Sequence, residues 1–224
     1  MLTTIPTGSY LKAGLTMIYK ALSPIFRTKN KIEQPNDFIR FVNNNPKDIS
    51  DMFYGSDVRN IPHALDTLFD LSKVEYADRM FKEATFNILK LNMPKLRSAK
   101  NMFEGATGGR LSSCDFRGLV DTTEMFKFSC IDNIDTQNMP QVEIAKNMFE
   151  GSRMKHFEQF KFKSLKNVIG MFRGTYMSEV DSNGFENVEV YTNIFDAATV
   201  KCGFQGKLKE IAEEYGFKRI AKNK

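Results

Sequence analysis

The side chains that most often carry out chemistry are few in this chain and far apart. Neither of the two histidines, His63 and His156, has a serine or cysteine nucleophile at a spacing typical of a catalytic dyad or triad. The three cysteines, Cys114, Cys130 and Cys202, lack the C-x-x-C spacing of a zinc site and are an odd, scattered set that predicts no disulfide framework. We therefore expect no catalytic residue, no metal site and no cofactor, and predict that the protein is not an enzyme.

Two other patterns could hold a phosphate or a calcium ion. The Gly-rich segment 105–109 follows a predicted helical turn and precedes a predicted strand, which reverses the order in phosphate-binding loops. We interpret it as a turn. Asp132 and Asp135 lack the spacing and the terminal glutamate of an EF-hand loop, so we interpret them as surface charges.

Basic and aromatic residues alternate in one segment. It contains Arg153, Lys155, Phe157, Phe160, Lys161, Phe162, Lys163 and Lys166. These phenylalanines fall at positions that the repeat described below predicts to be buried, so they are not free to stack on bases. We disfavour a nucleic-acid partner, whereas the net charge of +5 permits an acidic protein or a glycan.

The strongest pattern is a repeat of the dipeptide Met-Phe. Its phenylalanine recurs every 23 residues from Phe103 to Phe195, and the heptapeptide Ala-Lys-Asn-Met-Phe-Glu-Gly occurs at both 99–105 and 145–151. A constant period in the twenties is typical of a solenoid, in which each unit buries its apolar face against its neighbours.

Position 2 of the repeat, counted from the Met as position 1, is always phenylalanine. We expect these side chains to stack into a continuous spine, while position 5, always Ala, Ser or Thr, leaves room for it. The predicted spine consists of Phe81, Phe103, Phe126, Phe149, Phe172 and Phe195.

Two hydrophobic spacings coexist in each unit. Positions 10, 13 and 15 form an L-x-x-L-x-L pattern, as in Phe157, Phe160 and Phe162, which predicts a short parallel strand. From position 18 into the next unit the spacing fits one face of a short helix or helical turn. The sequence therefore predicts an α/β solenoid of about 23-residue, leucine-rich-repeat-like units.

These motifs resemble the BspA-type leucine-rich repeat family, in its Met-Phe-x-Gly-small branch. The resemblance rests on Met148–Ser152, on the Phe157–Phe162 pattern and on Met171–Thr175, and it covers residues 52–216. It implies a non-enzymatic recognition solenoid of the kind found in bacterial adhesins and phage-encoded proteins. Surface members of the family usually carry a secretion signal or a wall anchor. We find neither here, nor a stretch long and apolar enough to cross a membrane.

The two ends of the chain differ from the repeat. Residues 1–30 form a predicted arm whose apolar helix face is Leu11, Leu15, Ile18 and Leu22. The arm could cap the solenoid, dock the protein to a larger assembly or, least favoured, lie on a membrane. We assign residues 31–216 to the solenoid, with 31–51 as a degenerate first unit and 207–216 as a C-terminal helical cap. Residues 217–224 form a basic tail.

Outward strand positions offer the clearest candidate interface. Positions 12 and 14 should point away from the core, which gives a predicted partner-binding face of Ser113, Asp115, Thr136, Asn138, Gln159, Lys161 and Ser182. The alternative interpretation is that this polar face is only solvated.

These features together predict a non-catalytic module that binds a protein partner and no small-molecule substrate. A phage virion component, docked through residues 1–30, is the first setting that we consider. The alternatives are a bacterial surface adhesin and an intracellular binding module or effector. Because we find no export signal, we favour the virion or the cytoplasm over a secreted location.

Overall fold

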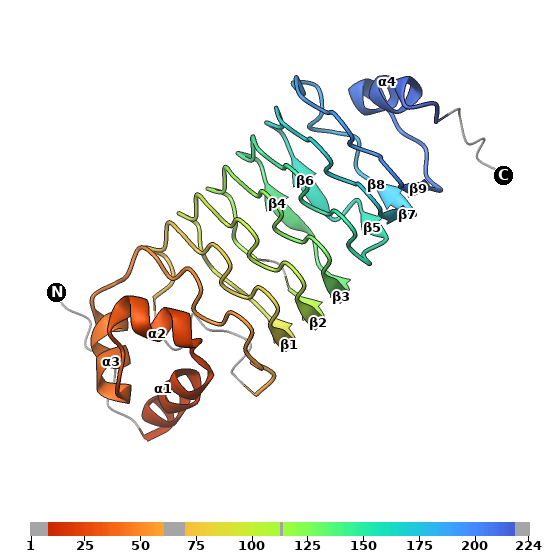
Figure 1. Ribbon diagram of the computed structural model, residues 1–224. Coiled ribbons are helices and arrows are strands. Elements are labelled where there is room, and N and C mark those ends of the chain that lie inside the picture. The colour runs from red at the N-terminus through yellow and green to blue at the C-terminus, as the bar shows by residue number, and fades with distance from the viewer. Residues whose placement is uncertain (1–8, 61–69, 113, 218–224) are drawn as a thin grey trace.

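A computed structural model describes residues 9–60, 70–112 and 114–217, which form an elongated parallel β-solenoid of about five turns with helices at both ends (Figure 1). The predicted spacing is confirmed, since Thr107 pairs with Cys130 and Leu111 with Ile134, each 23 residues further on. The helices are α1 (Ser9–Ala21), α2 (Pro24–Asn30) and α3 (Pro35–Asn43) before the coils, and α4 (Gly206–Glu214) after them.

Each coil contributes short strands that pair only with the neighbouring coils. One row occupies positions 6 to 10, and a second occupies positions 13 to 15 (Figure 1). The first row comprises β1 (Thr85–Leu89), β2 (Thr107–Leu111), β3 (Cys130–Ile134), β5 (His156–Phe157), β7 (Tyr176–Met177), β8 (Glu179–Val180) and β9 (Thr199–Val200); the second comprises β4 (Gln137–Met139) and β6 (Phe160–Phe162). All of these pairings are parallel.

The L-x-x-L-x-L pattern does not form one strand. In the best-matching unit Phe157 ends β5, whereas Phe160 and Phe162 belong to β6, so the chain turns a corner between them. All three rings are buried because both strands face the same core. The spacing therefore identified inward positions correctly but hid the bend.

The Gly-rich segment predicted as a turn is divided, since Gly105 lies in a turn with positive φ whereas Gly108 and Gly109 lie in strand β2. A Cβ on Gly108 would lie 2.3 Å from the ring of Phe86 in the preceding coil, and a Cβ on Gly109 would lie 2.8 Å from the carbonyl oxygen of Asn87. The prediction was wrong for Gly108 and Gly109, because these glycines admit a large neighbouring ring and a close backbone and do not reverse the chain.

The Met-Phe segments are linked turns, not helices. Each coil has a residue of positive φ just before the Met and another at position 4. The former are Asp51, Arg79, Asn101, Glu124, Asn147, Gly170 and Asn193; the latter are Gly55, Glu83, Gly105, Phe128, Gly151, Gly174 and Ala197. Position 4 is left-handed even without glycine, so the turns with Glu83, Phe128 and Ala197 have the same backbone conformation there as the turns with glycine.

Hydrogen bonds explain why these segments are turns. The N–H groups of Asn101, Phe103 and Gly105 donate to carbonyl groups of the next coil at 2.8–2.9 Å. The intervening N–H groups of Met102 and Glu104 donate to the carbonyl three residues earlier. Every second backbone N–H group thus forms a hydrogen bond to the next coil. The remaining N–H groups bond three residues back, so none forms the i→i−4 bonds of an α-helix.

The position 2 phenylalanines form the centre of the core. Successive rings from Phe81 to Phe195 lie nearly parallel, with centroids 5.3–6.0 Å apart. Phe53 extends the stack at its N-terminal end, 5.3 Å from Phe81. The small residue at position 5 is buried beside the stack from Ala84 to Thr175, and the hydroxyls of Ser129 and Ser152 lie 3.3 Å apart there.

The segment interpreted as a degenerate first unit, 31–51, differs from a coil. Pro35 and a capping box between Gln34 and Asp37 begin helix α3, and the first cross-coil bridge is at Asp48, opposite Tyr76. Local capping thus favours a helix over a strand here.

Among the described residues, none of the helices has both the length and the apolar character needed to cross a bilayer.

Candidate functional site

The predicted partner-binding face lies along the second strand row. Asn138 is exposed between the buried Gln137 and Met139, and Lys161 lies between the buried Phe160 and Phe162. Asp115 pairs in register with Asn138, which pairs with Lys161. Three consecutive coils therefore present one outward side chain each in a straight row. Ser113 lies outside the described residues.

Surface interactions fix the direction of these side chains. Asp115 forms an ion pair with Arg117 at 2.6 Å, and this hydrogen bond lowers the pKa of the Asp115 carboxyl. Lys161 Nζ lies 2.8 Å from a carboxylate oxygen of Asp181.

Position 12 is held in the same way. Thr136 Oγ1 donates to Gln159 Oε1 at 3.0 Å, and Ser182 Oγ accepts the backbone N–H of Gln205 at 3.1 Å. The row combines both signs of charge with neutral hydrogen-bonding groups, and its geometry is set by the coils beneath it.

The arm residues lie against the core where they can be described. Ile18 and Leu22 are buried in the same cluster that runs through the solenoid. Tyr19 Oη donates to the carbonyl of Glu33 at 2.6 Å, which ties α1 to the segment before α3. The side chains of Leu11 and Leu15 lie outside the described part of the structure.

The first strand row carries a second candidate site, which the sequence did not predict. His156 lies in β5 and pairs in register with Glu179 in β8. Both occupy position 9 of the repeat, as do Asn133 in the preceding coil and Cys202 in the following one. His156 precedes the strand predicted from the L-x-x-L-x-L pattern, yet it lies in β5, because the first strand row includes residues before position 10. His63 lies outside the described residues.

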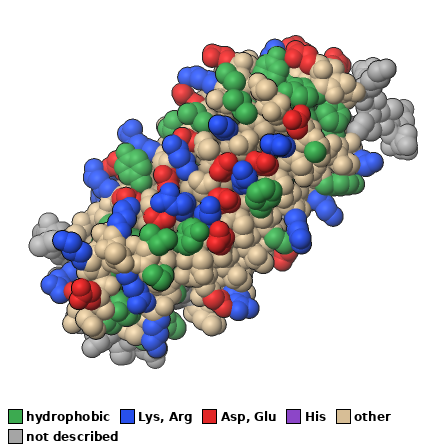
Figure 2. All heavy atoms as spheres, in the orientation of Figure 1, with side chains coloured by type: hydrophobic (Ala, Val, Ile, Leu, Met, Phe, Trp, Pro, Cys, Tyr) green, Lys and Arg blue, Asp and Glu red, His purple; other side chains and the backbone are tan. Residues whose placement is uncertain are grey.

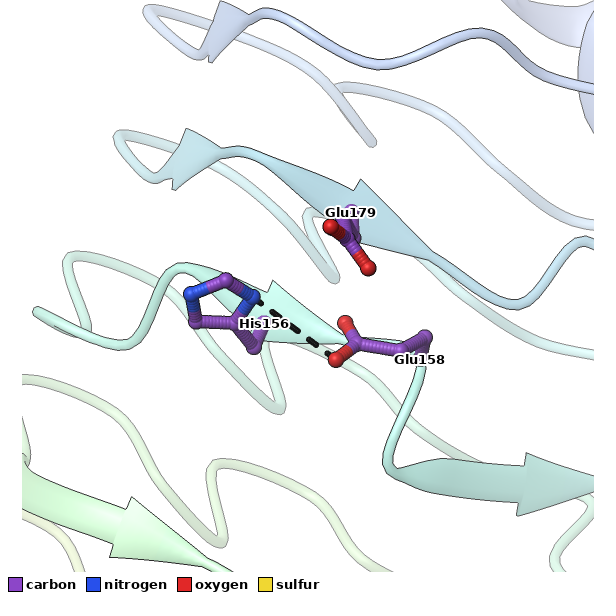
Figure 3. Close-up of side chains that lie close together, drawn as sticks. All are labelled: His156, Glu158 and Glu179. Atoms are coloured by element: carbon purple, nitrogen blue, oxygen red, sulfur yellow. Dashed lines mark ion pairs between the residues drawn. The ribbon is translucent and has the colours of Figure 1, made fainter.

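Glu158 completes this site from the corner after β5 (Figure 3). Its Oε1 lies 3.7 Å from His156 Nδ1 and accepts a hydrogen bond from Gln159 Nε2 at 3.1 Å. The carboxylate of Glu179 points toward that of Glu158 from the next coil. One side-chain oxygen or nitrogen from each of the three residues lies within 4.8 Å of the others.

The surroundings of the cluster are partly enclosed. His156 and Glu158 line a groove of about 600 Å³ together with Asn133, Arg153 and Lys155. Burial raises the pKa of the Cys202 thiol, and the negative charges of Glu179 and Glu158 add to that shift. The arrangement gathers nitrogen and oxygen ligands on one side of the solenoid.

Comparison with known proteins gives one match, to the family described as "Mycoplasma protein of unknown function, DUF285", over residues 18–113 and again over 109–205. The chain belongs to the DUF285 family. Together the two matches include every coil described above and both candidate sites. No curated protein and no solved structure matches the chain.

Proposed function

We propose that this DUF285 protein is a non-catalytic binding module, of the BspA-like leucine-rich-repeat type, that recognises a partner protein through repeat positions 12 and 14. The observation that supports this most is the row Asp115, Asn138 and Lys161, one residue from each of three consecutive coils. A parallel solenoid holds such a row at a spacing of about 4.8 Å, so recognition needs little ordering of the module itself.

The charges on the surface favour a protein over a nucleic acid. On the face shown in Figure 2, basic and acidic side chains are interleaved along the solenoid instead of gathering into a patch of one sign. Nucleic-acid binding depends on a concentrated basic surface, whereas mixed charge and hydrogen-bonding groups suit the polar rim of a protein interface.

Charge reversal at Lys161 tests this proposal. Lys161→Glu reverses one charge in the row and also places two carboxylates together at Asp181. Lys146→Glu makes the same charge change at an exposed position in the turns and serves as the matched control. In affinity capture from the native host, the partner should be retained by the wild type and by the control but lost with Lys161→Glu. Equal capture by all three would refute the row as the interface.

We also propose that the helices at the two ends cap the solenoid. The burial of Ile18 and Leu22 supports this at the N-terminal end, and that of Leu208 and Ile211 in α4 supports it at the C-terminal end. Exposed ends of a solenoid leave core uncovered, so caps are needed for solubility.

Shortening the Leu22 side chain tests whether the N-terminal helices cap the solenoid or dock it to an assembly. Leu22→Ala should lower the free energy of unfolding by about 2–4 kcal/mol, whereas Met17→Ala, at an exposed site on α1, should change it by less than about 0.5 kcal/mol. If both variants are as stable as the wild type but deletion of residues 1–30 abolishes assembly into a larger complex, the docking-arm alternative is correct.

The same binding role can be exercised in three settings, which we rank as a virion component, a surface adhesin and an intracellular module. The family description names Mycoplasma, which supports a bacterial host. Fractionation of that host separates the settings. Recovery with purified particles supports the first, recovery in the envelope fraction the second, and recovery only in the soluble cell extract the third.

A further inference from the structure

Several charged side chains on this solenoid form an ion pair with a residue of the next coil. Lys82 pairs with Glu104 at 2.8 Å, and Lys127 pairs with Glu150 at 3.0 Å. The glutamates of the site formed by His156, Glu158 and Glu179 lack a partner of this kind. In the described part of the chain neither glutamate forms an ion pair with lysine or arginine, and the only ion-pair partner of Glu158 is His156.

The orientation of Glu158 adds a second observation. Its Oε2 is buried and accepts no hydrogen bond from the described residues, while its Oε1 is shared between His156 and Gln159. A buried carboxylate oxygen without a donor is unfavourable unless a cation or a donor from outside the chain satisfies it. Glu179 brings a second negative charge to the same place, which increases the need for a positive ligand.

We propose that His156, Glu158 and Glu179 bind a divalent transition-metal cation, with Zn²⁺ as the ion that fits best. Two ligands of a tetrahedral Zn²⁺ ion, each at roughly 2.1 Å from the metal, lie roughly 3.4 Å apart. The 3.7 Å between His156 Nδ1 and Glu158 Oε1 is close to that value. All three ligand atoms already lie within 4.8 Å of one another, so small rotations of exposed side chains would close the site.

The ligand chemistry favours Zn²⁺ over Ca²⁺ or Mg²⁺. An imidazole suits zinc and its neighbours in the first transition row, whereas calcium takes six to eight oxygen ligands and magnesium prefers oxygen as well. Three protein ligands leave a fourth position open, as in zinc sites that bind a further group. His156 and Glu158 also line the groove of about 600 Å³, so the fourth ligand would enter from that side. The site lies beside the proposed partner-binding face, since Gln159 at position 12 donates to Glu158 Oε1, but none of the three ligands belongs to that face.

The repeat itself explains how the site forms. His156 and Glu179 occupy the same position of consecutive units, so the stacking of the coils places them side by side. Glu158 joins them because the chain turns a corner between β5 and β6 and returns its side chain toward His156.

Calorimetric titration of the full-length, metal-free protein with ZnCl₂ tests the proposal. We expect one Zn²⁺ per chain with a dissociation constant in the micromolar range or below, and at least a tenfold loss of affinity in each of His156→Ala, Glu158→Gln and Glu179→Gln. Glu186→Gln, an exposed carboxylate in the same coil as Glu179, should bind Zn²⁺ as the wild type does. Far-ultraviolet circular dichroism confirms that each variant is folded.

Competition experiments define the ion. Zn²⁺ should bind at least a hundredfold more tightly than Ca²⁺ or Mg²⁺, with Mn²⁺ in between, following the order of first-row metals on nitrogen and oxygen ligands. The proposal fails if the folded wild type does not bind Zn²⁺. It also fails if the three variants retain wild-type affinity, because the ion would then be bound elsewhere on the chain.

Discussion

On the turn side of the solenoid, position 3 of successive units carries Lys82, Glu104, Lys127, Glu150 and Arg173, and each charge stacks on one of opposite sign. On the strand side, position 9 carries His156, Glu179 and then Cys202, with Glu158 drawn in beside them. The same 23-residue stacking operates in both regions. In the first it pairs these five charges within the chain, and in the second it assembles groups that an external ligand can satisfy.

The comparison shows how a repeat fold separates stability from binding. Cross-strand pairs of opposite charge stabilise neighbouring coils and oppose a shift in register, whereas like charges placed opposite each other destabilise them. The fold therefore tolerates the two neighbouring carboxylates of Glu158 and Glu179 only if the rest of the coil is stable without them. The phenylalanine stack and the turn-side ladder provide that stability.

The largest expected effect comes from breaking the interior that both regions share. Phe126→Ala removes a fully buried ring that stacks on Phe103 and Phe149, and should lower the free energy of unfolding by about 3–5 kcal/mol. Phe128→Ala in the same coil removes a ring that is 57% exposed and should have an effect below about 1 kcal/mol. Chemical denaturation measures both. Similar losses would mean that the stack is not the main source of stability.

A smaller effect is expected on the turn side, at Glu124. Burial tends to raise the pKa of this carboxyl, but hydrogen bonds from Lys127 and Asn101 outweigh burial and lower it below its ordinary value of 4.5. Because the pKa is lower in the folded state, the stabilisation is present above pH 4.5 and is lost as the pH falls through the folded-state value.

Glu124→Gln should therefore destabilise the protein by about 1–2 kcal/mol at pH 7 and by progressively less in acid. Thermal unfolding of wild type and variant between pH 7 and pH 3 measures the difference. The exposed Glu189→Gln serves as the control and should be as stable as the wild type at pH 7. A gap between wild type and Glu124→Gln that persists at pH 3 would show that the loss is one of packing and not of charge.

Substitution of Ala197 tests the turn geometry. We expect it to change the free energy of unfolding by about 0.5–1 kcal/mol. It occupies position 4 with φ of 54°, a conformation that an L-residue adopts at a cost of about 1–2 kcal/mol and that glycine adopts freely. Ala197→Gly should raise the midpoint of thermal unfolding, and Gly55→Ala, at the same position with no atom near its missing Cβ, should lower it. The same direction of change in both would contradict a left-handed requirement at this position.

The repeat period was sufficient to predict the solenoid and its inward positions, because stacking forces equal positions into register. It left a short helix and a helical turn open as alternatives for the Met-Phe segments. Buried Ala99, Met102, Phe103 and Ala106 fall at a helical spacing, yet linked turns produce the same spacing. The indication in the sequence was a pair of positions four apart, filled by Asn or Gly in most units, since those residues tolerate positive φ.

The candidate sites were predictable to different degrees. The row at Asp115, Asn138 and Lys161 followed from simple alternation along a strand. The alignment of His156 with Glu179 was present in the period as well, but position 9 lies outside the leucine-rich-repeat pattern, which includes only position 10 of that strand row. The approach of Glu158 depends on the corner between β5 and β6, whose direction no spacing in the sequence specifies.

The smallest expected effect on stability is that of Glu179→Gln, which compares the strand side directly with the turn side. In metal-free buffer at pH 8, Glu179→Gln removes one of two neighbouring negative charges and should stabilise the protein by about 0.2–1 kcal/mol. On the turn side, by contrast, Glu124→Gln should destabilise the protein.

Adding Zn²⁺ should make the wild type more stable than Glu179→Gln, because a ligand that binds only the folded state stabilises the wild type more than a variant that binds it weakly. Thermal unfolding with a chelator and then with Zn²⁺ gives both values. Destabilisation by Glu179→Gln in the chelator would mean that the two carboxylates do not repel each other in the folded protein, and the opposition between the two sides would not hold.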